Sequence, residues 1–136
     1  MTDKQAQSIL YSLAQGSEGY REAEAEYAAL LPEEAALPEG LAADVLRYLS
    51  QDPETAEAVD YYTRSQEETR AFGAELILTA GAVLSCAMFL LRSHIKFEKD
   101  KEGKTVFKFE HKPADNDLLV KIVDALAKLF DGKSGA

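Results

Sequence analysis

Two histidines, His94 and His111, are the side chains of this sequence whose ordinary titration lies near neutral pH. Either imidazole could act as a general base or as a metal ligand. In the strand register that the alternating pattern predicts, His94 lies opposite Glu110, whereas His111 shares the other face of the strand pair with Ile95. One metal ion could not easily bind both rings, and neither ring has the glutamate three residues earlier that a di-iron carboxylate helix requires. We therefore expect both histidines to be strand-end residues.

Two short motifs resemble fragments of catalytic sites. "SHIK", 93–96, has the S-x-x-K spacing of acyl-transfer enzymes, but that chemistry needs both residues on one helical turn, and here the motif crosses from helix to strand. "GKS", 132–134, resembles the end of a phosphate-binding loop, but Ala127 stands where the first glycine belongs and the segment follows a helix. With no nucleophile and base identifiable, we expect no enzyme activity, no cofactor and no metal.

Charge and composition exclude other classes. The 136 residues carry a net charge of −9, with sixteen acidic and five basic side chains in residues 1–91 and ten basic and eight acidic in residues 92–136. An acidic chain lacks the clustered cations that nucleic-acid binding needs. The single Cys86 allows no intrachain disulfide, and "MTDKQAQSILYSLAQG" lacks the features of a secretory signal. These features predict a cytoplasmic protein.

Apolar residues recur at helical spacing along most of the chain. The predicted helices cover about 2–16, 17–31, 41–50, 53–69 with a break near Gly73, and a last helix from Asp115 or Asp117. Asp52 followed by Pro53 is a typical helix start. Whether residues 53–92 form one helix or two stays open, because an unbroken helix of that length would be unusual.

The period of the pattern changes to two from His94. In "HIKFEKDKEGKTVFKFEH", a three-residue loop ending at Gly103 pairs Phe97 with Phe107 and Ile95 with Phe109. Such a two-stranded hairpin leaves its edges unpaired, so a second copy or a partner could add a strand there, or lysines could protect the edges. The candidate interaction surface consists of Lys96, Glu98, Lys104, Lys108 and Glu110.

The sixteen-residue run "LILTAGAVLSCAMFLL", 76–91, contains no charge. At 1.5 Å per residue it spans about 24 Å, less than the roughly 30 Å of a bilayer core. A helix apolar nearly all round is also typical of the centre of a small domain, where amphipathic helices and an apolar hairpin face cover it. This second interpretation explains more of the sequence, while a membrane anchor over 71–91 remains the alternative.

The C-terminal half resembles the effector-associated constant components of bacterial conflict systems. The resemblance lies in the order of an apolar helix with Arg92 at its end, a charged hairpin with one glycine, and a short amphipathic helix, as in "AMFLLRSHIKFEKDKEGKTVFKFEHKPADNDLLVKIVDALAKLF". It implies a small non-enzymatic adaptor encoded near proteases or nucleotide-dependent signalling proteins. It carries over no catalytic or binding residues.

The sequence thus predicts an α+β fold, predominantly helical, with about five helices and one antiparallel β-hairpin (94–111) packed near a central apolar helix (about 74–92). Residues 1–131 form a single domain, in which a helical region spans 1–92 and a hairpin plus C-terminal helix spans 93–131, followed by a disordered tail 132–136. The leading function is a protein-interaction or adaptor module that binds an unidentified protein or forms a homodimer. A small enzyme or ligand-binding protein is the third alternative, which a pocket uniting His94, Glu75 or Tyr61 would favour.

Overall fold

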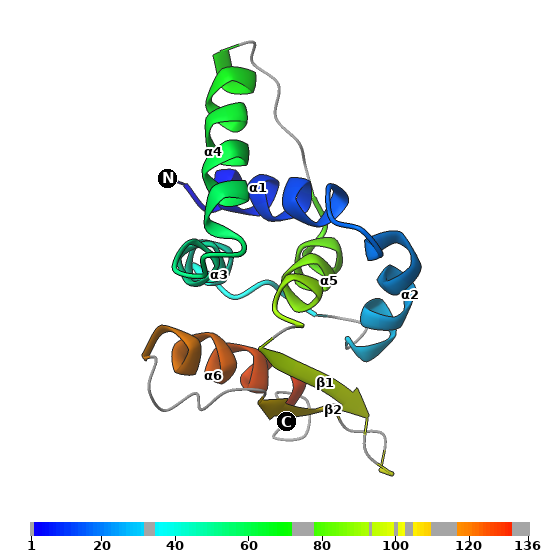
Figure 1. Cartoon of the computed structure of the whole chain (residues 1–136). Helices are drawn as coiled ribbons and strands as arrows, with labels where there is room; N and C mark the ends of the chain where they lie inside the picture. Colours follow the sequence, from blue (N-terminus) through cyan, green and yellow to red (C-terminus); the bar gives the residue numbers. More distant parts are fainter. Residues whose placement is uncertain are drawn as a thin grey trace.

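The computed structural model describes residues 2–31, 35–71, 78–92, 94–99, 101–102, 105–109 and 117–131, and side chains for all of these except 66–71, 97, 99, 105–109, 130 and 131. The described residues form six helices and two strands (Figure 1). The helices are α1 (Asp3–Gln15), α2 (Tyr20–Leu30), α3 (Leu41–Ser50), α4 (Ala56–Ala71), α5 (Ala80–Leu90) and α6 (Asp117–Asp131), and the strands are β1 (Ile95–Lys99) and β2 (Thr105–Phe109). The predominantly helical character is therefore confirmed.

The start of α1 follows from its first residues. The Thr2 hydroxyl accepts a hydrogen bond from the Gln5 backbone N–H at 3.2 Å, and the Gln5 side chain accepts one from the Thr2 N–H at 2.8 Å. This reciprocal pair is the predicted capping box, and it satisfies backbone donors that the first turn leaves free. The helix ends at Gln15, before Gly16, as predicted.

The second helix begins three residues later than predicted. Its first residue is Tyr20, because Gly19 has φ 89°, a left-handed conformation that interrupts the helix and favours glycine. The predicted start at Ser17 is wrong, since the Ser17 hydroxyl instead donates a hydrogen bond back to the Leu13 carbonyl at the end of α1.

The region between α3 and α5 also departs from expectation. Asp52 begins a turn and not α4 itself: its carboxylate accepts the Glu54 N–H, its carbonyl accepts the Thr55 and Ala56 N–H groups, and α4 starts only at Ala56. The long segment forms two helices, with α4 ending at Ala71 and α5 starting at Ala80. The predicted break near Gly73 is consistent with these ends, although Gly73 itself lies outside the described residues.

The predicted central helix is present with shorter bounds. α5 is Ala80–Leu90 rather than about 74–92, because the Thr79 hydroxyl accepts the Ala82 N–H at 3.1 Å and begins the helix there. It packs against α1 and α2, and in Figure 1 it lies below α1, with α3 on one side and α2 on the other. Residues 83–91 are all buried. Over the portion of the chain that the structure describes, no helix has the length and apolar character needed to cross a membrane.

The two strands pair antiparallel with Ile95 opposite Phe109 and Phe97 opposite Phe107, which is the register that the alternating pattern predicts. β1 follows α5 closely, because the Ile95 N–H donates to the Leu91 carbonyl at 2.8 Å. The Ile95 side chain is fully buried and joins the helical core. The predicted turn at Gly103 and the predicted tail 132–136 lie outside the described residues.

Candidate functional site

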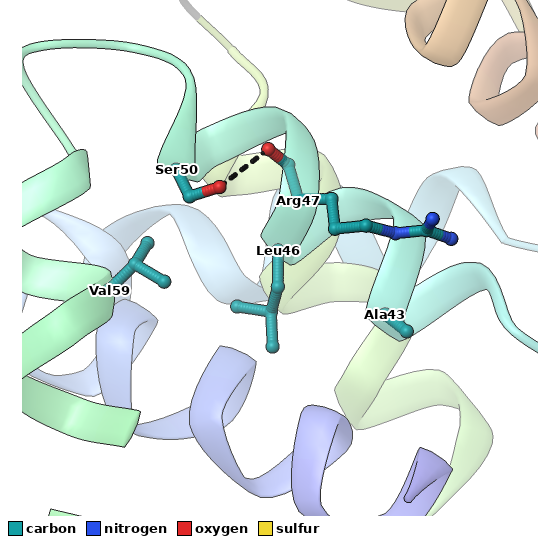
Figure 2. Close-up of a pocket in the computed structure, with 5 residues that line it drawn as sticks. All are labelled: Ala43, Leu46, Arg47, Ser50 and Val59. Atoms are coloured by element: carbon teal, nitrogen blue, oxygen red, sulfur yellow. Dashed lines mark hydrogen bonds between the residues drawn. The ribbon is translucent and has the colours of Figure 1, made fainter. Parts of the chain in front are cut away.

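One face of α3 borders an open cavity. Ala43, Leu46, Arg47 and Ser50 occupy positions i, i+3, i+4 and i+7, so they follow one another along the same side of the helix. Together with Val59 of α4 they line a cavity of about 400 Å³ (Figure 2). We call this feature, defined by these five residues, the α3–α4 groove.

The α3–α4 groove has an apolar floor and a polar rim. Leu46 and Val59 are both buried, and in Figure 2 the Val59 side chain points toward Leu46. Arg47 and Ser50 are exposed. The Ser50 hydroxyl donates a 2.7 Å hydrogen bond to the Arg47 carbonyl. The Arg47 side chain extends along α3, away from Val59, in Figure 2. An apolar floor with a few polar groups at its edge is typical of binding sites.

A buried carboxylate holds the basic rim in place. Asp44 is 7% exposed at its side chain and pairs with Arg47 of the same helix and with Lys121 of α6, the latter at 3.3 Å. The Arg47 and Lys121 side chains are 65% and 67% exposed. Two cations thus share one buried acid, and a buried charge is tolerated when it is paired in this way. The Lys121–Asp44 pair also joins α6 to α3.

His94 lies in a second polar cluster. Its Nε2 is 2.9 Å from the Asp52 carboxylate, and its Nδ1 is 2.9 Å from the Tyr48 hydroxyl, with the Tyr48 and His94 rings packed edge to face. The backbone N–H of Glu54, and then the His94 ring, lower the pKa of Asp52. Burial, and then the Asp52 charge, raise the pKa of Tyr48.

Sequence patterns do not indicate this cluster. They predict His94 at a strand end opposite Glu110, but it lies in the turn before β1, and its ring nitrogens contact residues of α3 and of the α3–α4 connection. Glu110 and His111 are outside the described residues. Because Asp52 is 42 positions away in the sequence, no local spacing reveals the contact.

The single cysteine belongs to the core. Cys86 is buried, and its thiol lies 3.2 Å from the Tyr20 hydroxyl. Burial raises the pKa of Cys86 and is also the main cause of a raised pKa for Tyr20. Both groups therefore stay protonated at neutral pH, and a protonated thiol is a poor nucleophile.

The residues of the predicted interaction surface lie elsewhere. Lys96 and Glu98 are on β1, with 3.4 Å between the ammonium nitrogen and the carboxylate. The backbone of Lys108 pairs opposite Lys96, its side chain is not described, and Lys104 and Glu110 are outside the described residues. Neither Lys96 nor Glu98 lines the α3–α4 groove.

The pocket expected for an enzyme or ligand-binding protein is not the one found. Tyr61 is 64% exposed, His94 is held in its own cluster, and Glu75 is outside the described residues. The α3–α4 groove includes neither Tyr61 nor His94. In the ranges given above, no three His, Cys, Asp or Glu side chains are grouped so as to hold a metal ion.

Comparison with known proteins found no matching protein family, no matching curated protein and no matching solved structure.

Proposed function

We propose that this chain is a non-enzymatic protein-binding module whose docking site is the α3–α4 groove. The observation that carries the proposal is the cavity of about 400 Å³ beside α3, with the buried Leu46 and Val59 at its base and the exposed Arg47 at its rim. Arginine beside a desolvated apolar pocket is a common centre of binding energy at protein interfaces. A role as an adaptor in a bacterial defence or signalling system would follow from the resemblance of the C-terminal half.

Two side chains that could act as nucleophile or base support a role without catalysis. The His94 ring contacts Asp52 through one nitrogen and Tyr48 through the other, and Cys86 is buried with a raised pKa. These contacts give both side chains structural roles. The groove, by contrast, presents the exposed Arg47 and Ser50 side chains and the half-buried Ala43 to solvent, and polar groups around a less polar centre suit recognition of another protein.

Self-association belongs to the same proposal. Within the described portion of the chain, β1 pairs with β2 and with no third strand. A two-stranded sheet is marginal alone, and an open edge can accept a strand from a second molecule. Lys96, 61% exposed on β1, lies where it could either protect that edge or contact a partner.

Site-specific photocrosslinking in cells that produce the full chain tests the docking site. A benzophenone amino acid placed at Ser50, on the groove rim, should give an adduct of defined mass, whereas the same amino acid at Ala28, exposed on α2, should not. Adding Ala43→Arg, which fills the groove, should reduce the Ser50 adduct at least fivefold. The matched change Ala25→Arg on α2 should leave it unaltered.

Each outcome has a clear meaning. An adduct with twice the mass of the chain identifies the partner as a second copy and supports self-association through the groove. An adduct with another mass that disappears with Ala43→Arg supports a different protein partner. Equal labelling from Ser50 and Ala28, or a Ser50 adduct that tolerates Ala43→Arg, would show that the groove is not a docking site.

A further inference from the structure

One side of α4 is exposed and carries an acid, an aromatic ring and a base in that order. Glu57, Tyr61 and Arg64 occupy positions i, i+4 and i+7, so they lie on one face of the helix. All three are exposed, Tyr61 to 64% and the Arg64 side chain to 76%. The buried Val59 is on the opposite side of the helix, and α4 stands at the outside of the molecule in Figure 1. We call Glu57, Tyr61 and Arg64 the outer face of α4.

The aromatic residue of this face is the most exposed large apolar side chain in the described part of the chain. The next is Val120 of α6, at 38%. The Tyr61 ring packs edge to face on the Tyr62 ring, with 5.1 Å between the ring centroids, and the Tyr62 hydroxyl lies close to Gly16 of α1. Tyr61 is therefore supported from the protein side and open on the other. Tyrosines that present an apolar ring in this way are enriched at the centres of protein interfaces.

The outer face of α4 is complementary to itself. A second copy of α4 that packs antiparallel, with the two-fold axis beside Tyr61, places Arg64 of each copy opposite Glu57 of the other and brings the two Tyr61 rings together. Such a contact uses the same patch on both copies, so the two ion pairs form together. A parallel copy would instead place acid on acid and base on base. The order of the charges therefore selects an antiparallel second copy.

Further acids lie near the outer face and fit the same arrangement. Asp60 is 62% exposed and pairs with Arg64 of its own chain, with 3.2 Å between a guanidinium nitrogen and a carboxylate oxygen. In the helix pair the two Asp60 residues come near each other, with an Arg64 on either side. Each Arg64 then lies between its own Asp60 and Glu57 of the second copy, and a guanidinium has five N–H donors to share between two carboxylates. Glu68 lies opposite position 53, which precedes α4, so it is at the end of the paired segment.

We propose that a second copy of this chain binds the outer face of α4, as an antiparallel helix pair with Tyr61 against Tyr61 at the centre and Arg64 against Glu57 on either side. This surface is distinct from the α3–α4 groove, because Val59 lines that groove from the other side of α4. In Figure 1 it is also far from β1. The inference therefore goes beyond the proposed docking site and does not depend on it. An interface of one helix from each copy is small, and small interfaces are typical of weak, transient association.

Reversing one charge at a time tests the pairing in the full chain. In Glu57→Arg both charged positions of the outer face are basic, and in Arg64→Glu both are acidic, so each variant should repel its own copy. A 1:1 mixture of the two variants restores both ion pairs. Sedimentation equilibrium in about 0.15 M salt, which screens the long-range repulsion between acidic chains, measures the association. Each variant alone should dimerise at least tenfold more weakly than the unmodified chain, and the mixture should recover dimers.

Matched variants control for net charge and for exposed apolar surface. Glu22→Arg and Arg21→Glu make the same changes of charge at exposed positions of α2, so each should dimerise like the unmodified chain and their mixture should gain nothing. Tyr61→Ala should weaken the dimer at least tenfold, because it removes the central contact. Val120→Ala shortens the other exposed apolar side chain and should leave the dimer unchanged. Circular dichroism of every variant should show an intact fold.

The outcomes are distinct. Dimers that are lost in both single reversals and return in their mixture support the helix pair. A chain that stays monomeric at every concentration up to its solubility limit would refute it. Dimers that tolerate both reversals would also refute it, and would place self-association on another surface, such as the β1 edge or the groove. None of these results decides whether the groove binds a different protein, which the crosslinks from Ser50 test separately.

Discussion

Gly16 is the residue whose small size the structure uses most directly. It follows α1 with φ −82° and ψ −5°, a conformation that any residue can adopt, so its backbone does not require glycine. The residues around Gly16, however, do require a glycine. A Cβ atom at this position would overlap the Tyr62 hydroxyl oxygen of α4 and lie 3.3 Å from the Ser12 carbonyl oxygen. The absence of a side chain thus permits the close approach of α4 to the end of α1.

Replacing Gly16 with alanine should therefore destabilise the protein by about 1–2 kcal/mol, because the Tyr62 ring must move. In a Tyr62→Phe background the clash with the hydroxyl is gone, and the same replacement should be neutral or stabilising by up to about 1 kcal/mol, since alanine restricts the unfolded chain. Urea denaturation of the unmodified chain, the two single variants and the double variant measures both effects. A loss of equal size in both backgrounds would mean that Tyr62 is not the obstacle.

At the scale of elements, Thr79 determines where the buried helix begins. Its hydroxyl accepts the Ala82 N–H at 3.1 Å, and the residue lies just after the segment 72–77 that is outside the described residues. Thr79→Ala should lower the free energy of unfolding by about 1 kcal/mol, because a helix N-terminus loses its capping acceptor. Thr79→Ser keeps the acceptor and should change stability by less. If Thr79→Ser and Thr79→Ala lower the free energy of unfolding equally, the methyl group of Thr79, and not its hydroxyl, stabilises the start of α5.

The elements differ in how well the sequence predicts them. α3 has the predicted bounds Leu41–Ser50, because Leu41, Val45 and Leu49 form a continuous apolar stripe that the core buries. The predicted start of α4 is wrong, because a turn at Asp52 precedes the helix; the contact of the Asp52 carboxylate with His94, 42 positions away, is also absent from any local pattern. The late starts of α2 and α5 have local causes, namely the left-handed Gly19 and the Thr79 cap.

The α3–α4 groove illustrates the same limit at the candidate site. The pattern of α3 predicts that Leu46 points inward, and it places Arg47 at the edge of that stripe. The cavity, however, depends on α4 bringing Val59 beside α3, and the pairing of Asp44 depends on Lys121 of α6 reaching it. These positions result from packing of the whole core, and no spacing in the sequence encodes them individually.

At the scale of the whole molecule, two sets of polar contacts join α3 and its following turn to the C-terminal segments. The Asp44–Lys121 pair links α3 to α6, and the Tyr48–His94–Asp52 cluster links α3 and its turn to the residue before β1. In Figure 1, α6 and the two strands lie together beneath the helices α3 and α5. α3 therefore lines the groove on one side and holds the C-terminal elements on another.

The charge of Asp52 should make this second link sensitive to acid. The Glu54 N–H and then His94 lower the pKa of Asp52, so the ionised form is favoured in the folded state. A depressed pKa contributes stability that is fully present above the unfolded-state value of about 3.9 and is lost as pH falls through the folded-state value. The difference in stability between the unmodified chain and Asp52→Asn should accordingly be largest at neutral pH and shrink below about pH 4.

Urea denaturation at a series of pH values measures that difference in the free energy of unfolding. We expect a difference of about 1 kcal/mol at neutral pH, because a hydrogen bond to a charged group contributes about that much more stability than one between neutral groups. Tyr48→Phe is the control: it removes a contact with His94 but leaves the Asp52 charge, so its effect should not shrink in acid as that of Asp52→Asn does. Hydrogen exchange should also accelerate at the amides of β1 in Asp52→Asn, since the link restrains the start of that strand. A pH-independent effect of Asp52→Asn would mean that the carboxylate acts here only by its shape and hydrogen bonding, and that its charge does not help to hold β1 to α3.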